Sequence, residues 1–501
     1  MATFKLTTAQ IDRAAGVLLG MACGDALGAG YEFGPPLGGD VEVKMAGGGS
    51  CGWAPGEWTD DTSMAIAIAE VSAEGGDLRL VESQDRIAAR WAEWSQGAKD
   101  VGIQTQNVLD QATRAARARG EHLPRARDLE EAAAALHRRT GKTAGNGSLM
   151  RTAPVALAFL DDPGGLVEAA SAISALTHHD PEAGEACALW CLAIRHAVLW
   201  GTFDGLREAL AQLPEQRAAV WGQRLDEAES GEPADFEHNG WVVEALQGAW
   251  SAITNAQAPA ATASGRFPAD HLRRALETAV RGGRDTDTVA AIAGSLLGAK
   301  WGASAVPSAW RRLVHGWPGL RARDLVRLGV LSARNGGSDP QGWPTGARVD
   351  YSSYPHRNAI AAHPYDDRVW LSGVEALAEL PEGVDAVVSL CRLGIDDVPG
   401  VAVKADSHVE VWLIDDANPA KNPHLDYVLQ DAASAVAAFR AEDKTVLLHC
   451  VQAQSRTPTV AALYGAMVTG RPPMDCLADV LKALPAAHPN SAMLAALERL
   501  S

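Results

Sequence analysis

The sequence has few cysteines and no long apolar run. Its seven cysteines are scattered over 501 residues without a CxxC pair, which disfavours a disulfide framework and a thiolate zinc site and favours a reducing compartment. No segment reaches the roughly 20 apolar residues that span a membrane. The first residues lack the basic-then-apolar pattern of a signal peptide. We therefore expect a cytoplasmic protein with no membrane partner.

Positive charge is also in short supply. The chain has 62 Asp and Glu residues against 44 Lys and Arg, for a formal net charge of −18. Nonspecific binding to a nucleic-acid backbone needs a positive surface, so we do not expect it. An anionic substrate is compatible with this charge, because a local pocket or a bound metal can reverse the field. The length exceeds that of one ordinary core and predicts two or three domains.

The first 318 residues have almost no strand-like segments. Alanine and leucine dominate, and apolar residues recur at spacings of three and four, which predicts helices at 11–28, 63–74 and 287–302. We expect one all-α domain over residues 8–318. Residues 319–349 are polar and rich in Gly and Pro over much of their length, and are predicted to be a linker.

Residues 350–501 have a different pattern. Short runs rich in Val, Leu and Ile predict strands, and a helical run at 425–442 precedes the last of them. The predicted strands cover 368–373, 384–391, 409–415 and 444–450. Alternating strands and helices indicate an α/β domain, with a central parallel or mixed sheet flanked by helices.

Two acidic clusters stand where a glycine-rich loop enters an apolar helix. Their members are Thr59, Asp60 and Asp61 in the first cluster, and Asp285, Asp287 and Thr288 in the second. Helix capping explains either cluster alone. Together they hold more carboxylates than caps use, and four converging carboxylates need cations to stay ionised. An all-oxygen ligand set suits Mg²⁺ or Mn²⁺, and two such ions fit the charge.

Six segments occur in the order found in one enzyme family. They are GVLLGMACGDALGAGYEF (16–33), GEWTDDTSMA (56–65), GNGSLMRTAPVAL (145–157), LTHHDPEA (176–183), NGWVVEALQGAWSAI (239–253) and GGRDTDTVAAIAGSLLGAKWG (282–302). With these segments, residues 10 to 318 resemble the ADP-ribosylglycohydrolases, which are all-α enzymes. The resemblance implies hydrolysis at the anomeric carbon of an ADP-ribose, and it implies that the six acidic-cluster residues hold a binuclear Mg²⁺ or Mn²⁺ site.

The resemblance also implies roles for residues outside the metal set. Asp25 and Glu32 would lie at the edge of the metal and substrate site, with Glu32 able to serve the attack. The loop of Asn146, Gly147 and Ser148 would contact the ADP-ribose, and His178 would lie near its distal ribose and diphosphate. A surface acid at Glu32, a plain turn at 145–148 and a helix-end histidine at His178 remain the alternatives.

A second constellation lies near the end of the chain, in VLLHCVQAQSRTPTVAAL (446–463). The segment predicts a buried strand ending at Cys450 and a helix beginning near Arg456, with Pro458 in its first turn. The N–H groups of the five intervening residues can form an anion-binding nest, which Arg456 can close around a phosphoryl group. The same positive field favours Cys450 as a thiolate nucleophile. A buried structural cysteine is the alternative.

This Cys-x5-Arg segment resembles the loop of dual-specificity and tyrosine phosphatases, over residues 350 to 501. The resemblance implies Cys450 as the nucleophile and Arg456 as the phosphate binder. It also implies that Thr457 eases departure of the thiolate and that His449 supports the loop. Asp415 or Asp416 would be the general acid, with Asp415 slightly preferred. Many such phosphatases carry glycine at the position of Ala453, so slow turnover is a further expectation.

Both constellations together predict a bifunctional hydrolase. One activity would release ADP-ribose from an ADP-ribosylated protein or small molecule with the help of two divalent cations. The other would hydrolyse a phosphate ester of a phosphorylated substrate. The alternative is a sensor that binds ADP-ribose and phosphate, with a slow or inactive phosphatase-like domain.

Overall fold

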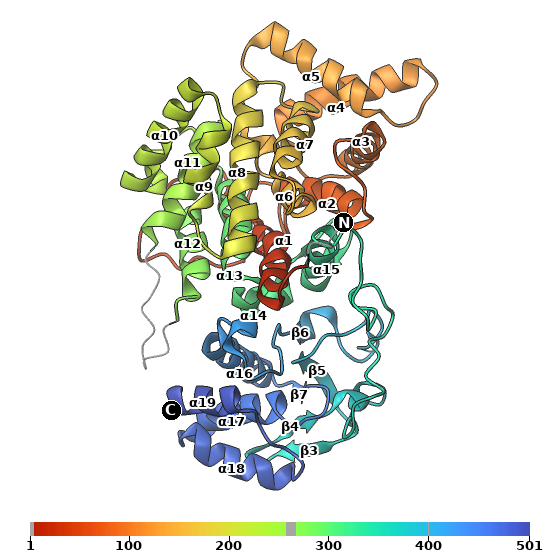
Figure 1. Ribbon diagram of the computed structural model, residues 1–501, viewed down its shortest axis with the longest axis vertical. Coiled ribbons are helices and arrows are strands. Elements are labelled where there is room, and N and C mark those ends of the chain that lie inside the picture. The colour runs from red at the N-terminus through yellow and green to blue at the C-terminus, as the bar shows by residue number, and fades with distance from the viewer. Residues whose placement is uncertain (1–4, 257–266, 399) are drawn as a thin grey trace. The chain divides into compact units, whose positions relative to one another are not determined.

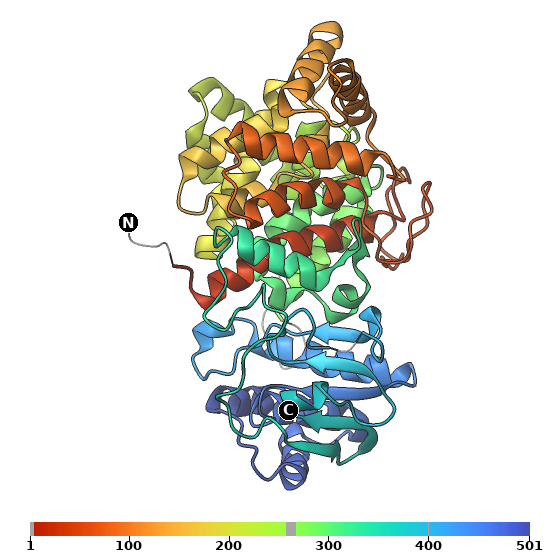
Figure 2. The ribbon, with the colours of Figure 1, turned by 90° about the vertical axis from the view of Figure 1, so that its right-hand side faces the viewer.

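A computed structural model describes residues 5–256, 267–398 and 400–501 (Figure 1). Residues 257–266, inside the predicted first domain, lie outside the described residues. The chain divides into two compact units. The first holds most of the chain up to Gly337, and the second begins at Ser338 and also includes Pro307–Arg312. Figure 2 shows the helices and strands from a second direction.

The first unit is helical, which confirms the predicted all-α domain. Its first helices are α1 (Thr8–Gly28), α2 (Asp60–Ala73), α3 (Val81–Ser95), α4 (Ile103–Ala118), α5 (Ala126–Thr140), α6 (Ala153–Ala158), α7 (Pro163–Ala175) and α8 (Pro181–Trp200). They are followed by α9 (Gly205–Ala209), α10 (Glu215–Ser230), α11 (Val242–Asn255), α12 (Asp270–Arg281), α13 (Thr286–Trp301) and α15 (Ala322–Ser332). Helix α14 (Ser308–Leu313) falls almost entirely in the second unit. A two-stranded ladder joins β1 (His315–Gly316) to β2 (Leu320–Arg321).

Part of the predicted linker is a packed helix. Residues Ala322–Ser332 form α15, in which Leu325 and Val330 are fully buried. The approach of α15 to α1 is close, because a Cβ atom on Gly329 would lie 2.9 Å from the Ala14 carbonyl oxygen. The flanking residues are rich in glycine and proline, so the short apolar stripe of this helix was not recognised in the sequence. Tertiary contacts stabilise the helix. The linker prediction was therefore wrong over α15.

The second unit contains a five-stranded mixed sheet in the order β3-β4-β7-β5-β6. Its elements are β3 (Ile360–His363), β4 (Asp366–Ser372), β5 (Val384–Ser389), β6 (His408–Glu410), α16 (Leu425–Ala441), β7 (Thr445–His449), α17 (Arg456–Thr469), α18 (Pro473–Ala483) and α19 (Ser491–Arg499). Strand β3 pairs antiparallel with β4, and the other pairs are parallel. The mixed sheet confirms the predicted strand and helix alternation.

The predicted strand at 409–415 is shorter than expected. Strand β6 ends at Glu410. Beyond it, backbone groups form hydrogen bonds with side chains. The Asn422 side chain binds both backbone groups of Ile414, and Arg456 donates to the Leu413 carbonyl. These contacts satisfy the polar groups that a longer strand would have paired.

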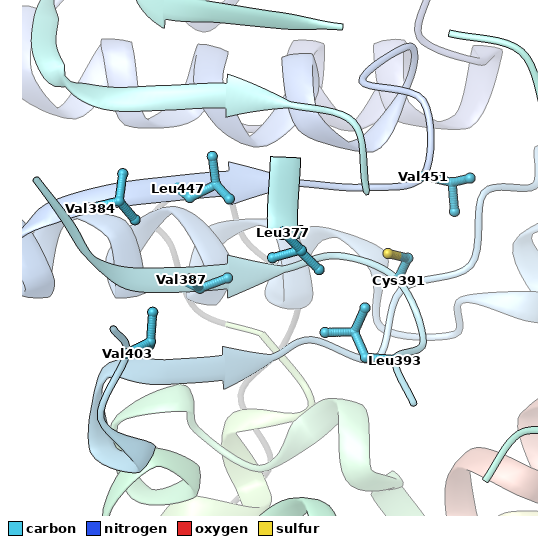
Figure 3. Close-up of a cluster of buried hydrophobic side chains, with 8 residues drawn as sticks. All are labelled: Leu377, Val384, Val387, Cys391, Leu393, Val403, Leu447 and Val451. Carbon is cyan, nitrogen blue, oxygen red and sulfur yellow. The ribbon is translucent and has the colours of Figure 1, made fainter. Parts of the chain in front are cut away.

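One face of the sheet packs on loops (Figure 3). The cluster drawn there joins β5 and β7 to the segments that follow β4 and β5. Its buried members are Leu377, Val384, Val387, Cys391, Leu393, Val403, Leu447 and Val451. Side chains alternate between faces along a strand, so Val388 and Leu448 belong to the opposite face, toward α16 and α17. Both faces are therefore covered.

Among the described residues, no helix has the length and apolar character needed to cross a membrane.

Candidate functional site

The acidic site of the first unit is built on the contact between α1 and α13. The two helices run antiparallel, with Gly16 against Gly298 and Gly28 against Asp287. A Cβ atom on Gly28 would lie 2.5 Å from the Asp287 Cα, so only glycine fits there. This approach brings the end of α1, and Glu32 in the loop after it, to the first turn of α13.

Asp25 in α1 holds the start of α2. Its carboxylate accepts hydrogen bonds from the Thr59 N–H at 2.9 Å, the Thr62 N–H at 3.0 Å and the Thr62 hydroxyl at 2.6 Å. Burial raises the pKa of Asp25 to about 6, although these bonds favour the ionised form. The structure thus places Asp25 beneath the N-terminus of α2, as a support for the acidic segment. We predicted a substrate-binding role for Asp25 at the edge of the metal and substrate site, and in the structure its carboxylate is fully buried.

The two acidic segments meet at the first turns of α2 and α13. Oxygen atoms of Glu32, Asp285 and Asp287 all lie within 4.8 Å of one another. The hydroxyl groups of Thr59 and Thr288 both point to Oδ2 of Asp61, at 3.2 and 3.4 Å. Asp61 therefore connects the start of α2 to the start of α13.

Two carboxylate oxygens in this cluster have no donor. Oδ1 of Asp61 and Oδ1 of Asp287 are buried, and neither has a hydrogen-bond partner in the part of the chain that the structure describes. A buried oxygen without a partner is costly, and a bound cation would remove the cost. Hard divalent cations such as Mg²⁺ and Mn²⁺ prefer carboxylate and hydroxyl oxygens. The residues present therefore fit divalent cations.

The carboxylates of the cluster disfavour one another's ionisation. Burial, and then the charge of Asp285, raises the pKa of Glu32 to about 8. Burial, followed by the charges of Asp100 and Asp25, raises the pKa of Asp60 to about 7. Burial and neighbouring carboxylates raise the pKa values of Asp61 and Asp287 well above their usual range. Such a set gains from a cation, because the cation offsets both effects.

Asn146 links its loop to the cluster. It lies in a single 3-10 turn, Asn146–Ser148, and its Nδ2 donates to Asp285 Oδ2 at 2.7 Å and to the Asn239 carbonyl at 2.9 Å. Oδ1 of Asn239 in turn accepts from the Asp285 N–H at 3.2 Å. Asn146 therefore orients a cluster carboxylate. This contact differs from the ligand contact that we predicted for it.

His178 and Ser148 are buried behind this turn. Nδ1 of His178 lies 2.7 Å from the Thr177 hydroxyl, and a Cβ atom on Gly147 would lie 3.0 Å from the His178 ring. The Ser148 hydroxyl accepts from Ser174 at 2.9 Å. Glycine at position 147 thus permits the ring to pack on the turn. Ser148 is buried in the interior, whereas its predicted contact with ADP-ribose would need an accessible side chain.

The second unit places Cys450 and Arg456 at the two ends of one loop, between β7 and α17. The Cys450 side chain is buried, and its backbone N–H lies 3.3 Å from the Ser372 carbonyl. Ala453 in the loop has a φ of 52°, in the left-handed region. Glycine adopts this conformation without cost and alanine does not. The loop therefore takes a glycine-type turn with alanine in the strained position.

Arg456 is anchored at the carboxyl ends of the strands. Its Nη1 donates to the Leu390 carbonyl at 2.6 Å and to the Leu413 carbonyl at 3.1 Å. Its Nε lies 3.6 Å from Asp415 Oδ2, and the side chain is buried. The guanidinium is thus held beside the loop by carbonyl groups and one carboxylate.

The two candidate acids have different surroundings. Asp415 faces Arg456 and accepts from Asn490 Nδ2 at 2.9 Å. Asp416 is half-buried, forms an ion pair with Lys421, and accepts from the Asn418 N–H at 2.8 Å as a turn cap. The Lys421 contact holds the pKa of Asp416 below its usual range. Asp415 is therefore the one whose carboxylate lies beside the loop.

His449 and Thr457 flank the loop inside the core. Nε2 of His449 lies 2.7 Å from the Ser389 hydroxyl, and burial lowers the pKa of His449 to about 4. The ring is neutral at pH 7 and holds the end of β7 to β5. Oγ1 of Thr457 is buried and has no hydrogen-bond partner among the described residues. This hydroxyl is therefore available to donate a hydrogen bond to a bound group.

Sequence reasoning missed several residues of these sites. Asp100 lies near enough for its charge to raise the pKa values of Glu32 and Asp60, but it stands in a loop without a motif. Asn239 opens a segment that carried the family resemblance, and that position was the available signal. Asn490, which binds Asp415, lies 75 residues beyond it and gave no sequence signal.

Comparison with known proteins identifies the first unit. The sequence profile of the ADP-ribosylglycohydrolase family matches residues 6–337. This chain belongs to the ADP-ribosylglycohydrolase family. One relative of this glycohydrolase is the ADP-ribosylarginine hydrolase Tri1 of Serratia proteamaculans, 27% identical over 308 residues that cover 60% of this chain and 75% of the relative. Another is the ADP-ribosyl-[dinitrogen reductase] glycohydrolase of Rhodospirillum rubrum. It is 29% identical over 305 residues, which cover 60% of this chain and 89% of the relative.

Solved structures give the same assignment for the glycohydrolase region. An ADP-ribosylglycohydrolase-related protein complex aligns with 66% of this chain and 100% of its own, at 28% identity and a TM-score of 0.50. The residues after Gly337 lie outside the family match. Human DUSP28 aligns with 28% of this chain at 21% identity and a TM-score of 0.24, which is too weak to assign the second unit.

Proposed function

We propose that the first unit hydrolyses the bond between ADP-ribose and an arginine guanidine nitrogen. Two observations support this proposal, one for the substrate and one for metal-assisted hydrolysis. The relatives from Serratia and Rhodospirillum are named for ADP-ribosylarginine and for ADP-ribosylated dinitrogen reductase. The cluster also buries two carboxylate oxygens that lack a donor among the described residues, and this is the observation that carries the proposal.

The cluster has the ligands for two divalent cations. Those we assign are Thr59, Asp60, Asp61, Asp285, Asp287 and Thr288. Bound cations, Mg²⁺ or Mn²⁺, supply positive charge for ribose hydroxyls and for an attacking water. The chain itself keeps the ligands in place, with Asp25 under α2 and Asn146 on Asp285.

Glu32 is the residue placed to move a proton. It lies at the partly exposed edge of the cluster, and without cations burial and neighbouring carboxylates raise its pKa to about 8, so this carboxyl holds a proton more readily than an ordinary glutamate does. It can give this proton to the departing guanidine nitrogen as the bond to the anomeric carbon breaks. Water supplies the new hydroxyl at that carbon, and Glu32 recovers a proton from it.

The test is ADP-ribose release from ADP-ribosylated arginine, with ADP-ribosylserine as a comparison substrate. We expect release by the wild type only when Mg²⁺ or Mn²⁺ is present. Glu32→Gln should lower kcat by 10² or more, the usual contribution of a general acid or base, and should leave Mn²⁺ binding within a few-fold. Equal turnover by Glu32→Gln and wild type would remove Glu32 from the mechanism. Tight ADP-ribose binding without any release would favour the sensor alternative.

For the second unit we propose hydrolysis of phosphate monoesters. The supporting observation is the position of Cys450 and Arg456 at the two ends of one loop, with Asp415 at 3.6 Å from Arg456 Nε. The Cys450 sulfur would attack phosphorus, Asp415 would protonate the departing ester oxygen, and water would then release phosphate from the sulfur. Thr457 has a free hydroxyl to stabilise the departing thiolate.

An assay of p-nitrophenyl phosphate hydrolysis tests this second activity. We expect Cys450→Ser to abolish turnover and Asp415→Asn to lower it more than Asp416→Asn does. The strained Ala453 agrees with slow turnover. Orthovanadate binding without turnover in the wild type would make the second unit a phosphate-binding domain.

A further inference from the structure

A fully buried arginine lies close to the glycohydrolase cluster. Arg151 is 0% exposed, and its guanidinium carbon lies 4.0 Å from the centre of the Trp91 ring. One nitrogen, Nη1, is 3.5 Å from the sulfur of Met64, and Nη2 donates to the Thr177 hydroxyl at 2.6 Å. Burial lowers the pKa of Arg151 to about 9, so it is still a cation at pH 7. Burying a cation among neutral groups lowers the stability of the fold, so we expect the buried arginine to have a function that explains it.

The arginine fixes the direction of a hydrogen-bond chain. Arginine only donates, so the Thr177 oxygen accepts from Nη2. The Thr177 hydrogen is then free to donate to Nδ1 of His178, 2.7 Å away. Nδ1 is therefore an acceptor, and the single ring proton of the neutral His178 is on Nε2.

The charge state of His178 agrees with this arrangement. Burial, and then the positive charge of Arg151, lowers the pKa of His178 well below its usual range. The ring is therefore neutral across the pH range in which most proteins are stable.

The other edge of the ring faces the turn that holds Asn146. Cβ atoms on Gly145 and Gly147 would lie 3.3 and 3.2 Å from Nε2 of His178. Between these two glycines stands Asn146, whose Nδ2 donates to Asp285 at 2.7 Å. A chain of contacts thus runs from Arg151 through Thr177 and His178 to the turn and the acidic cluster.

We propose that Arg151 and Thr177 are positioning residues that lock His178 in the Nε2–H tautomer, and that the locked ring holds the Asn146 turn against Asp285. The effect on metal binding rests on the proposed function of the cluster, whereas the tautomer does not. Residues that orient metal ligands from outside are typically worth 10- to 100-fold in metal affinity.

Two substitutions in the full-length chain separate this role from plain packing. Thr177→Val removes the hydroxyl at similar volume, and Thr177→Ser keeps it. The matched control is Thr143→Val. Thr143 also bonds a histidine Nδ1 through its hydroxyl, that of His137 at 2.6 Å, but no arginine donates to it among the described residues.

The primary readout is the ¹⁵N NMR spectrum of His178 in histidine-labelled protein, with His178→Gln used for assignment. In the wild type and in Thr177→Ser we expect a protonated Nε2 and an unprotonated Nδ1. Thr177→Val should move both shifts toward those of exchanging tautomers and weaken Mn²⁺ binding, measured by calorimetry, by about tenfold or more. Thr143→Val should change neither.

Two results would overturn the proposal. One is a proton on Nδ1 of His178 in the wild type. The other is a Thr177→Val variant that matches Thr143→Val in both tautomer and Mn²⁺ affinity. The proposed function has its own outcome: a wild type with the expected tautomer and no release of ADP-ribose supports the positioning chain while contradicting the hydrolase.

Discussion

Asp61 and Asp287 each bury a carboxylate oxygen with no partner in the described part of the chain. Helix capping, the ordinary use of such residues, does not require this, because a cap receives N–H donors. Neither Thr59 nor Asp285, the residues that precede α2 and α13, caps its helix through its side chain. At the residue scale, these acids are thus arranged for a cation at a cost to the metal-free fold.

Removing one of these carboxylates should have opposite effects with and without metal. We expect Asp287→Asn to raise the unfolding free energy in chelator by about 1–2 kcal/mol, because the amide has no ionisation for burial and neighbouring carboxylates to oppose. The same change should weaken Mn²⁺ binding at least tenfold. Thermal unfolding in chelator and calorimetry with Mn²⁺ measure the two effects. A loss of stability in chelator would show that the cluster is not under repulsion.

The raised pKa values predict how stability depends on pH. The folded protein keeps protons on Asp25, Asp60 and Glu32 up to about pH 6, 7 and 8, whereas the unfolded chain loses them near pH 4. Between these values the folded state binds more protons, so the unfolding free energy falls as the pH rises.

In chelator, we therefore expect the loss from about pH 5 to about pH 8 to be at least about 1.4 kcal/mol, the equivalent of one pKa unit. Saturating Mn²⁺ should flatten the dependence, since cations take the place of the protons. Thermal midpoints over this range, with and without Mn²⁺, measure it. A midpoint in chelator that rises with pH would contradict the expected protonation.

Ala453 gives a prediction for the loop between β7 and α17. Its φ of 52° costs an alanine about 1 kcal/mol that a glycine does not lose. We expect Ala453→Gly to be neutral or to raise the thermal midpoint slightly, because the flexible unfolded chain offsets part of the gain. The control is Ala466→Gly within α17, which should cost about 1 kcal/mol. Equal losses in both variants would mean that Ala453 is unstrained in solution.

At the scale of elements, the two sites use different devices. The glycohydrolase cluster depends on two helices whose backbones touch through glycine, so that Asp61 and Thr288, 227 residues apart, meet. The Cys450 loop follows the carboxyl end of β7, the central strand, which pairs in parallel with both its neighbours. The loop leads into helix α17. In both, charged groups gather at the first turn of a helix, where backbone N–H groups have no intrahelical partner.

The helix contact predicts a large loss on adding one methyl group. Gly298→Ala would overlap the backbone of Gly16, and neither helix backbone can yield without moving the cluster. We expect a loss of about 3 kcal/mol or more, at the upper end for overpacking, together with weaker Mn²⁺ binding. Gly39→Ala is the control, since nothing lies within 4 Å of the added carbon. Similar thermal midpoints for both variants would contradict the close contact.

At the scale of the whole molecule, the two sites share no residue and belong to separate compact units. We expect Cys450→Ser to leave ADP-ribose release within a factor of about two, and Asp287→Asn to leave phosphate release equally unchanged, since substitutions at sites without shared partners usually act independently. Assays of both products for both variants and the wild type measure this. A large cross effect in either direction would show that the activities are coupled.

Much of the fold was visible in the sequence, because local pattern and burial agree. The apolar spacing of α1, α2 and α13 and the apolar runs of β4, β5 and β7 fixed their type. Helix α15 was missed, and β6 was overextended, because contacts from distant residues decided both. The local sequence pattern does not contain information about contacts with distant residues.

The residue types of both sites were set by the sequence alone: oxygen ligands in two clusters, and a cysteine six residues before an arginine. The residues of a short motif determine which groups are available for binding or reaction, wherever the motif lies in the fold. Tertiary structure decided the roles within each site. It buried Asp25 under α2, turned Asn146 to Asp285, and set Asp415 rather than Asp416 beside Arg456. These outcomes depend on which backbones approach one another, and that follows from packing across hundreds of residues.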